Sequence, residues 1–139
     1  MSCNHILTIL AVGDVQRAVK FYTQAFGWTQ TVDVPVYAEF ELPGGMKLGL
    51  YERNSFGLNT GQLPVEIPAG DLAATELYFH SDDLDADIDR ILRAGARQLA
   101  ELKPRDWGDE AAYFTDPDGN VIVLARVTPK DLKQEKADP

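Results

Sequence analysis

Apolar residues recur along this chain with two alternating periods, one typical of strands and one typical of helices. The run at residues 6–12 is almost wholly apolar and predicts a buried strand. A helix is predicted next, because apolar residues at helical spacing follow Asp14, a good N-cap, and stop at Gly27, a good C-cap. Three further strands are predicted at residues 28–33, 36–42 and 46–53.

The same order of elements returns in the second half of the chain. The predicted elements are, in order, a strand at residues 74–80, a helix capped by Asp82 or Asp83 and ended by Gly95, a strand at 96–102 and a loop at 103–109. Two final strands then flank the turn Asp116-Pro117-Asp118-Gly119. Proline is preset for the first corner of a type I turn, aspartate tolerates the second, and glycine takes the positive φ that restores an antiparallel ladder.

The two halves can be aligned on each other as an internal repeat. Ile9 pairs with Tyr78 at a shift of 69 positions, and Gly45 of the earlier turn pairs with Gly119 at a shift of 74. Residues 54–71 lie between the halves and show no periodicity, so a long loop is predicted there. Each half therefore reads as one supersecondary unit that is repeated along the chain.

The expected organisation is a single domain of the α+β class. We expect two tandem βαβββ modules that form curved sheets around a cavity, with the helices on the outer faces. The predicted boundaries are about residues 5–53 for module one, about 54–72 for a linker, about 73–127 for module two and 128–139 for a charged tail.

The formal net charge of −9 excludes some partners. The three lysines of the tail balance its three acidic residues, so the rest of the chain carries the whole negative charge. Such a surface repels nucleic acid and anionic membranes. It favours a cationic ligand or serves only to keep the protein soluble.

Location and stability are predicted from the same composition. No apolar run approaches the ~20 residues of a membrane span. The single cysteine, Cys3, indicates a reducing, cytoplasmic setting. A chain of 139 residues buries about two-thirds of its unfolded surface, so neither a disulfide nor a structural metal is needed for stability.

Several short motifs resemble one known superfamily. They are Val12-Gly13-Asp14-Val15 before a helix with Phe21-Tyr22, the stop Phe26-Gly27, and the stretch from Tyr113 to Asn120. Together they resemble the vicinal oxygen chelate superfamily, which includes glyoxalase I, ring-cleaving dioxygenases, fosfomycin resistance enzymes and bleomycin-binding resistance proteins. The likeness covers residues 6–127. It implies the fold; the function must be argued from the site itself, because one fold hosts unrelated chemistries.

The resemblance also implies where a divalent metal would be held. Superfamily enzymes place histidine, glutamate or glutamine ligands on the first and fourth strands of each module. The matching positions here are Leu7, Gly49, Glu76 and Val123. Three of these residues cannot coordinate a metal, and one carboxylate alone does not hold a divalent ion against water. We therefore expect no metal cofactor.

A displaced metal site is the alternative. The two histidines, His5 and His80, fall on or beside strands expected to flank the cavity. With Glu76 or Glu39 they would complete a set of two histidines and one carboxylate. The competing interpretation is that both are ordinary surface or hydrogen-bonded histidines.

Strand alternation identifies the residues expected to line the cavity. It sends Phe40 and Phe114 to the helix side and leaves aromatic and charged side chains on the opposite face. Trp107 lies in a polar connection beside a glycine, where a large indole could roof the cavity. The candidate ligand-binding residues are Tyr37, Glu39, Tyr51, Arg53, Glu76, Tyr78, His80, Trp107 and Tyr113. Alternatively, the tyrosines cover a dimer interface and Glu39 pairs with Arg53.

The function expected from these residues is binding of a small organic molecule, of cationic or aromatic character, by a homodimer that uses no metal. Such a protein would resemble the bleomycin resistance members and act by sequestration. No Ser-His-Asp set, reactive cysteine or phosphate-cradling loop is visible, and no catalytic residue is assigned. The alternatives are a metal-dependent lyase or dioxygenase with a displaced site, and a metal-free isomerase or epimerase that uses Glu76 or Glu39 as its base.

Overall fold

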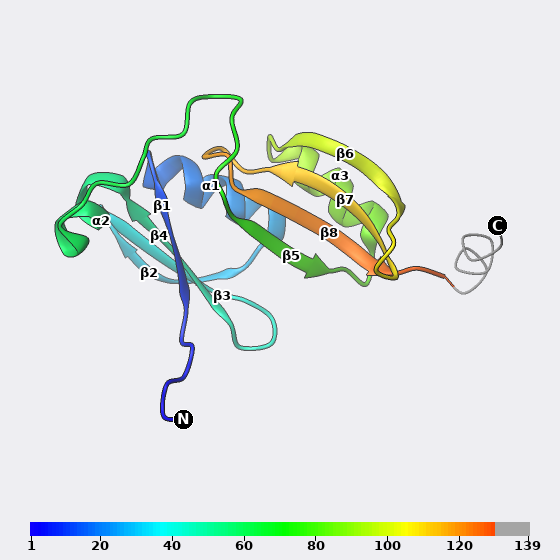
Figure 1. Ribbon diagram of the computed structural model, residues 1–139, viewed down its shortest axis with the longest axis horizontal. Helices are drawn as coiled ribbons and strands as arrows, with labels where there is room; N and C mark the ends of the chain where they lie inside the picture. Colours follow the sequence, from blue (N-terminus) through cyan, green and yellow to red (C-terminus); the bar gives the residue numbers. More distant parts are fainter. Residues whose placement is uncertain (130–139) are drawn as a thin grey trace. The chain divides into compact units, whose positions relative to one another are not determined.

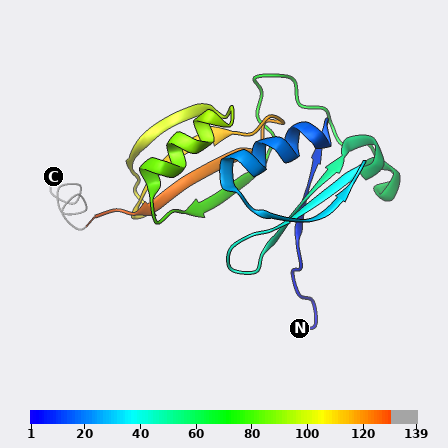
Figure 2. The same cartoon turned by 180° about the vertical axis from the view of Figure 1, so that it is seen from behind.

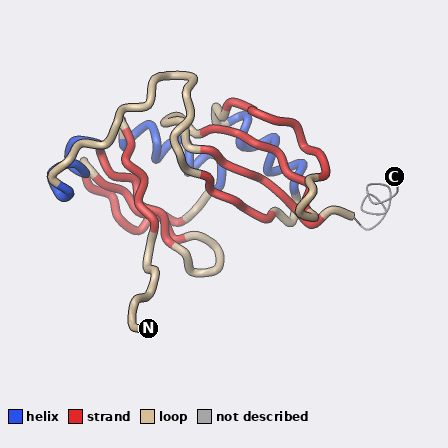
Figure 3. Tube along the Cα trace, in the orientation of Figure 1, coloured by secondary structure: helices blue, strands red, loops and turns tan. Residues whose placement is uncertain are grey.

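The computed structural model describes residues 1–129 and divides into two compact units. The first is Met1–Pro68, and the second begins at Ala69 (Figure 1). Each unit contains one four-stranded sheet, drawn in red in Figure 3, and the α+β class is confirmed. Of the charged tail expected at 128–139, the part from residue 130 onward lies outside the described residues.

The first unit follows the predicted order and adds a second helix. Its elements are β1 (Thr8–Val12), α1 (Val15–Phe26), β2 (Thr29–Val34), β3 (Tyr37–Glu41), β4 (Lys47–Glu52) and α2 (Arg53–Thr60). The strands lie in the order β1-β4-β3-β2. β1 runs parallel to β4, and the other pairs are antiparallel.

Helix α1 has the ends predicted for it. The side chain of Asp14 accepts a hydrogen bond from the backbone N–H of Arg17 at 3.1 Å, and Gly27 ends the helix with φ of 67°. The apolar stripe of α1 packs on the sheet, where Phe40 is fully buried as predicted. Phe26 stacks on Trp28 with ring centroids 4.3 Å apart, so aromatic packing links the helix end to β2.

Helix α2 lies within the loop predicted at residues 54–71 except for its first residue, and that prediction is wrong for residues 54–60. Arg53, predicted as the end of a strand, is the first residue of the helix. The helix begins because the Glu52 carboxylate accepts from the backbone N–H of Asn54 at 2.5 Å and of Ser55 at 3.3 Å. Gly61 ends it with φ of 78°. Gly57 is its only buried residue, so the apolar periodicity that reveals α1 is missing here.

The second unit repeats the order of the first. Its elements are β5 (Glu76–His80), α3 (Leu84–Arg93), β6 (Arg97–Pro104), β7 (Asp109–Thr115) and β8 (Val121–Val127). The strands lie in the order β5-β8-β7-β6, and Figure 2 shows α3 against one face of this sheet. The loop predicted at residues 103–109 is shorter, because β6 and β7 extend to within four residues of each other, at 105–108.

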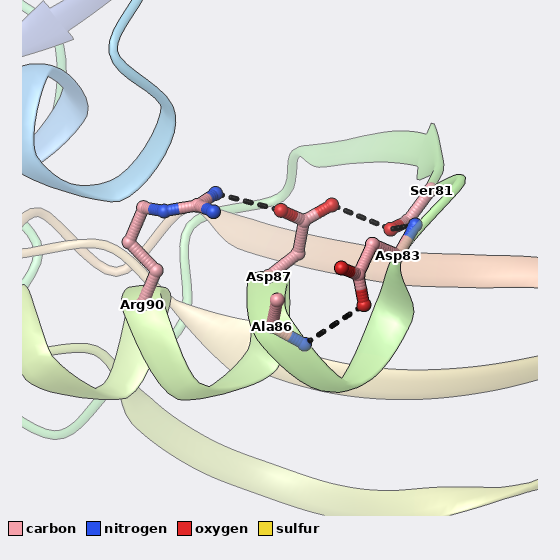
Figure 4. Close-up of polar contacts among 5 residues, drawn as sticks. All are labelled: Ser81, Asp83, Ala86, Asp87 and Arg90. Carbon is pink, nitrogen blue, oxygen red and sulfur yellow. Dashed lines mark hydrogen bonds and ion pairs between the residues drawn. The ribbon is translucent and has the colours of Figure 1, made fainter.

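Helix α3 begins at Asp83, one of the two caps predicted (Figure 4). The Asp83 carboxylate accepts from the backbone N–H of Ala86 at 3.4 Å. Ser81 Oγ accepts from the backbone N–H of Asp83 and donates to Asp87, which also pairs with Arg90 at 2.6 Å. These polar groups satisfy one another at the start of the helix, so they serve the fold.

The hairpin between β7 and β8 has the geometry predicted for it. Gly119 has φ of 85°, and its N–H donates to the carbonyl of Asp116 at 3.2 Å. The buried Asp116 carboxylate accepts from the backbone N–H groups of Asp118 and Asn120 and from the Asn120 side chain, each at 2.9 Å. Phe114, just before the turn, is fully buried on the helix side as predicted.

Candidate functional site: the sheet faces opposite the helices

In the first unit, the sheet surface away from α1 carries one set of alternating residues. We call this set the first face: Ile9, Ala11, Tyr37, Glu39, Gly49 and Tyr51. Gly49 lies in register with Ile9 on one side and Glu39 on the other. Tyr51 lies in register with Tyr37. Three of the candidate ligand-binding residues, Tyr37, Glu39 and Tyr51, therefore share one surface.

Tyr37 crosses this face over Gly49. Its hydroxyl donates to Glu39 Oε1 at 2.7 Å. A Cβ added at Gly49 would lie 2.5 Å from the Tyr37 hydroxyl oxygen, so only glycine fits beneath the ring. Burial, and then the hydrogen bond to Glu39 and its charge, raise the pKa of Tyr37 well above its usual range.

Tyr51 extends the aromatic surface toward α2. Its ring lies edge-on to Tyr37 at 5.2 Å and to Phe56 of α2 at 6.2 Å. Asn59, also on α2, donates its side-chain N–H to the Tyr51 hydroxyl at 3.1 Å. Phe56 and Asn59 were missed from the sequence because their segment was predicted to be a loop.

Arg53 does not join Tyr37 and Glu39, although alternation along β4 predicted that it would. β4 ends at Glu52, and Arg53 starts α2. Its guanidinium donates to the carbonyl of Pro64 at 3.1 Å and lies 3.8 Å from the Glu66 carboxylate. The expected alternative pair of Glu39 with Arg53 is therefore absent from the described residues.

The second unit has an equivalent surface, built on β5, β8 and β7. We call it the second face: Glu76, Tyr78, His80, Ala111, Tyr113, Val121, Val123 and Ala125. Ala111, Val123 and Ala125 form its buried apolar floor, against which Tyr113 and Val121 pack.

A polar network covers part of this floor. The Tyr78 hydroxyl donates to Asp109 Oδ2 at 2.5 Å and accepts from the indole N–H of Trp107 at 2.9 Å. His80 Nε2 lies 2.8 Å from the same Asp109 oxygen. Burial, and then the hydrogen bond to Asp109, raise the pKa of Tyr78, while the Trp107 hydrogen bond lowers it. The structure thus brings Tyr78, His80 and Trp107 together around one carboxylate.

Trp107 reaches this network because of a tight turn. The N–H of Gly108 donates to the carbonyl of Arg105 at 3.3 Å, and the N–H of Arg105 donates to the carbonyl of Asp109 at 2.7 Å. Gly108 has φ of 100°, which lets the chain re-enter the ladder after three residues. The indole is 55% exposed, as expected for a residue outside the core.

Tyr113 lies beside a second set of charges. The Arg105 guanidinium lies 5.0 Å from the centre of its ring and donates to the carbonyl of Ala111 at 2.9 Å. Burial and then the charge of Glu76 raise the pKa of Tyr113, while Arg105 lowers it. Arg105 and Asp109 were not among the predicted site residues, because both fell in the predicted loop. Extending the alternation of β7 back from Tyr113 through Ala111 would have placed Asp109 on this face.

The residues at the family's metal positions do not fit a divalent ion. Val123 is fully buried in the apolar floor, and Gly49 lies under the Tyr37 ring. Leu7 offers only hydrocarbon, which leaves Glu76 as the one oxygen donor of the four. Within residues 1–129, no three His, Cys, Asp or Glu side chains converge as metal ligands would.

A displaced site within either unit meets the same difficulty. Glu76 and His80 are four residues apart on β5, a separation of about 13 Å in a strand. Among residues 1–129, the one carboxylate that His80 contacts is Asp109, and His5 Nε2 lies 3.1 Å from the Thr8 hydroxyl.

Comparison with known proteins identifies the family. The family described as "Glyoxalase/Bleomycin resistance protein/Dioxygenase superfamily" matches residues 2–124. The chain belongs to this superfamily. The resemblance carried by the turn at Asp116 and the start of α1 is thereby confirmed.

Relatives within the superfamily show how far the likeness extends. Uncharacterized protein YraH of Bacillus subtilis is 27% identical over 125 residues, which cover 85% of this chain and 94% of that protein. CFP32 of Mycobacterium bovis is 28% identical over 121 residues, 83% of this chain but only 42% of its own length. A glyoxalase-related enzyme from Fulvimarina pelagi has the same fold, with a TM-score of 0.77, 19% identity and coverage of 89% and 88% of the two chains. None of the helices in residues 1–129 has the length and apolar character of a membrane span.

Proposed function

We propose that this member of the superfamily binds a small organic molecule of aromatic or cationic character and does so without a divalent metal. The observation that carries the proposal is the first face. It presents the half-buried rings of Tyr37 and Tyr51 beside the Glu39 carboxylate, with glycine at a position where the family places a metal ligand. Aromatic rings and one placed polar group are what most small-molecule sites contain.

The arrangement of these rings suits a flat ligand. The Tyr51 ring lies edge-on to both Tyr37 and Phe56, so the three rings form an angled surface on which a further ring can stack. The tyrosine faces and the Glu39 carboxylate would both attract a cation. The net charge of −9 raises the local concentration of cationic ligands further. Binding of this kind would remove a toxic compound from solution without making or breaking a bond.

We also propose that the protein acts as a homodimer in the cytoplasm. Both sheets are open, with β1 and β2 at the edges of one and β5 and β6 at the edges of the other. Unpaired edges favour association with a second chain. Cys3, the one cysteine, is exposed and unpaired, which suits a reducing compartment. Light scattering of the purified protein should give twice the mass of one chain; the mass of a single chain would rule out the dimer.

Metal analysis tests the first part of the proposal. Protein purified without chelator, then supplied in turn with nickel, zinc, manganese and iron(II), is expected to hold no metal in stoichiometric amount. A tightly bound ion that is lost on replacing His5 or His80 would overturn the proposal. The chain would then be a metal-dependent lyase or dioxygenase with a displaced site.

A ligand screen tests the second part. Aromatic cations and their neutral analogues are compared by thermal shift against the wild type, Glu39→Gln and Glu101→Gln. The two variants lose the same charge, but Glu101 is exposed on β6 of the other unit. A first-face ligand should bind Glu39→Gln about tenfold more weakly, since an interaction with a charged group contributes about 1.5 kcal/mol or more. Equal weakening by both variants would show that only overall charge matters.

A further inference from the structure

The second face uses most of its hydrogen-bond donors internally. The Trp107 indole N–H is bonded to Tyr78, and the Tyr78 hydroxyl is bonded to Asp109. Arg105 directs its N–H groups at the backbone carbonyl of Ala111. A ligand on this face therefore meets few free donors.

The contact between His80 and Asp109 creates a free acceptor. The Asp109 carboxylate can only accept, so the proton in the 2.8 Å contact belongs to His80 Nε2. A neutral imidazole protonated at Nε2 has a lone pair at Nδ1. Within residues 1–129, Nδ1 has no hydrogen-bond partner, and the imidazole side chain is 55% exposed.

The charged groups on this face include both signs. Asp109 and Glu76 contribute two carboxylates, and Arg105 and Lys103 contribute two cations. The Arg105 guanidinium is held over the Tyr113 ring, whereas Lys103 is exposed on the edge strand β6, in register with Ala111. Net charge therefore does not select the ligand here, which leaves the acceptor at His80 as the distinguishing polar group.

Trp107 supplies the apolar contact. Its N–H is already satisfied by Tyr78, which fixes the indole orientation, and the side chain is 55% exposed. Ala111, Val123 and Ala125 are fully buried on the same face and support it from beneath. An exposed aromatic ring of fixed orientation suits stacking with the body of an aromatic ligand.

We infer that the second face binds an aromatic molecule that carries an O–H or N–H donor, with the donor at His80 Nδ1 and the ring against Trp107. This inference rests on the proposed function, since it names the ligand chemistry of one of the two faces. The site would prefer ligands with a hydrogen-bond donor over those without one, and it needs no metal and no covalent step.

Matched ligands test the inference directly. Indole and N-methylindole share one shape but only indole has a donor, and phenol with anisole forms a second such pair. Binding is followed by two-dimensional proton–nitrogen NMR of the isotope-labelled full chain, through the indole N–H signal of Trp107. Trp28, which stacks on Phe26 in the first unit, is the internal control. Indole and phenol should bind about fivefold more tightly than their methylated partners, the value of one good hydrogen bond.

Two histidine variants complete the test. In His80→Leu the ratio of affinities within each pair should fall to about one, whereas in His5→Leu it should remain as in the wild type. Equal affinity of donor and methylated ligands for the wild type, or a preference that survives in His80→Leu, would overturn the inference. If no compound shifts the Trp107 signal, the second face is not a binding site. The first-face screen with Glu39→Gln then judges the proposed function separately.

Discussion

At two equivalent positions of the central strands, the first unit carries tyrosines and the second unit carries alanines. Tyr37 on β3 and Tyr51 on β4 correspond, 74 positions on, to Ala111 on β7 and Ala125 on β8. All four lie on the sheet face opposite the helix. The same backbone thus presents an aromatic surface in one unit and a small-residue floor in the other.

The edge strands show the reverse distribution. Ile9 and Ala11 on β1 correspond, 69 positions on, to Tyr78 and His80 on β5. The second unit therefore carries Tyr78 and His80 at its β5 edge in addition to Tyr113 on β7, whereas the aromatic residues of the first face stand on the central strands β3 and β4. The two units share one strand order, but the large side chains on the equivalent faces stand at different positions. Each large side chain is accommodated by small residues beside it.

The packing of large side chains against small ones explains which residues occupy the positions where the family places metal ligands. Gly49 is required by the Tyr37 ring above it, and Val123 fits because its neighbour is Ala111. Both positions are thus explained by packing within their own unit. The comparison predicts that neighbouring residues on one face are coupled through their volumes.

The largest expected effect concerns the hairpin turns, because the turn between β7 and β8 depends on a buried side chain and the turn between β3 and β4 does not. Asp116 accepts three hydrogen bonds while buried, whereas its counterpart in the first unit is Leu42, followed by Gly44 and Gly45 with φ of 89° and 90°. Asp116→Ala should lower the free energy of unfolding by about 3 kcal/mol, because it leaves several backbone donors unsatisfied. Urea unfolding followed by circular dichroism measures the change.

Asp106→Ala is the matched control for that measurement. Asp106 is an exposed aspartate in the turn between β6 and β7, so its loss should change stability by no more than about 0.5 kcal/mol. A loss below about 1 kcal/mol for Asp116→Ala would mean that Gly119 alone holds the turn.

Much of the fold could be predicted because its signals are local. Asp14, Gly27 and the turn at Asp116 act through bonds to residues a few positions away. α2 could not be predicted from periodicity, because the Glu52 carboxylate starts it and it buries almost nothing. Arg53 was misplaced for the related reason that alternation holds only while the strand continues.

The candidate site was predicted only where strands carry it. Tyr37, Glu39, Tyr51 and Tyr78 follow from alternation, since they lie inside regular strands. Asp109 depends instead on where β7 begins, which is set by its pairing with β8 some distance along the chain. Alternation back from Tyr113 through Ala111 reaches Asp109 only if the strand is taken to begin that early, whereas a loop was predicted there.

Exchanging the floor residues between units tests the coupling of volumes. Gly49→Val should cost about 2 kcal/mol, because the new side chain meets Tyr37 and the Ile9 side chain, whose Cγ1 would lie 3.0 Å from the added Cβ. Combining it with Tyr37→Ala reproduces the pair found at Ala111 and Val123. The double variant should then lose less stability than the sum of the two single variants, by about 1 kcal/mol or more. Additive losses would show that the two positions are independent.

The smallest expected effect distinguishes the tyrosines of the two faces at alkaline pH. The pKa of Tyr37 is raised in the folded chain, so stability is constant below the unfolded pKa near 10 and falls as pH rises above it. By pH 11 the loss from Tyr37 should be about 1 kcal/mol, since one pKa unit corresponds to about 1.4 kcal/mol. Tyr37→Phe should therefore show a shallower fall in melting temperature between pH 9 and 11 than the wild type. Tyr78→Phe should change that slope less, because Tyr78 is 41% exposed and the hydrogen bond from Trp107 opposes the rise in its pKa. An equal change of slope in both variants would mean that the central and edge tyrosines are buried to the same extent in solution.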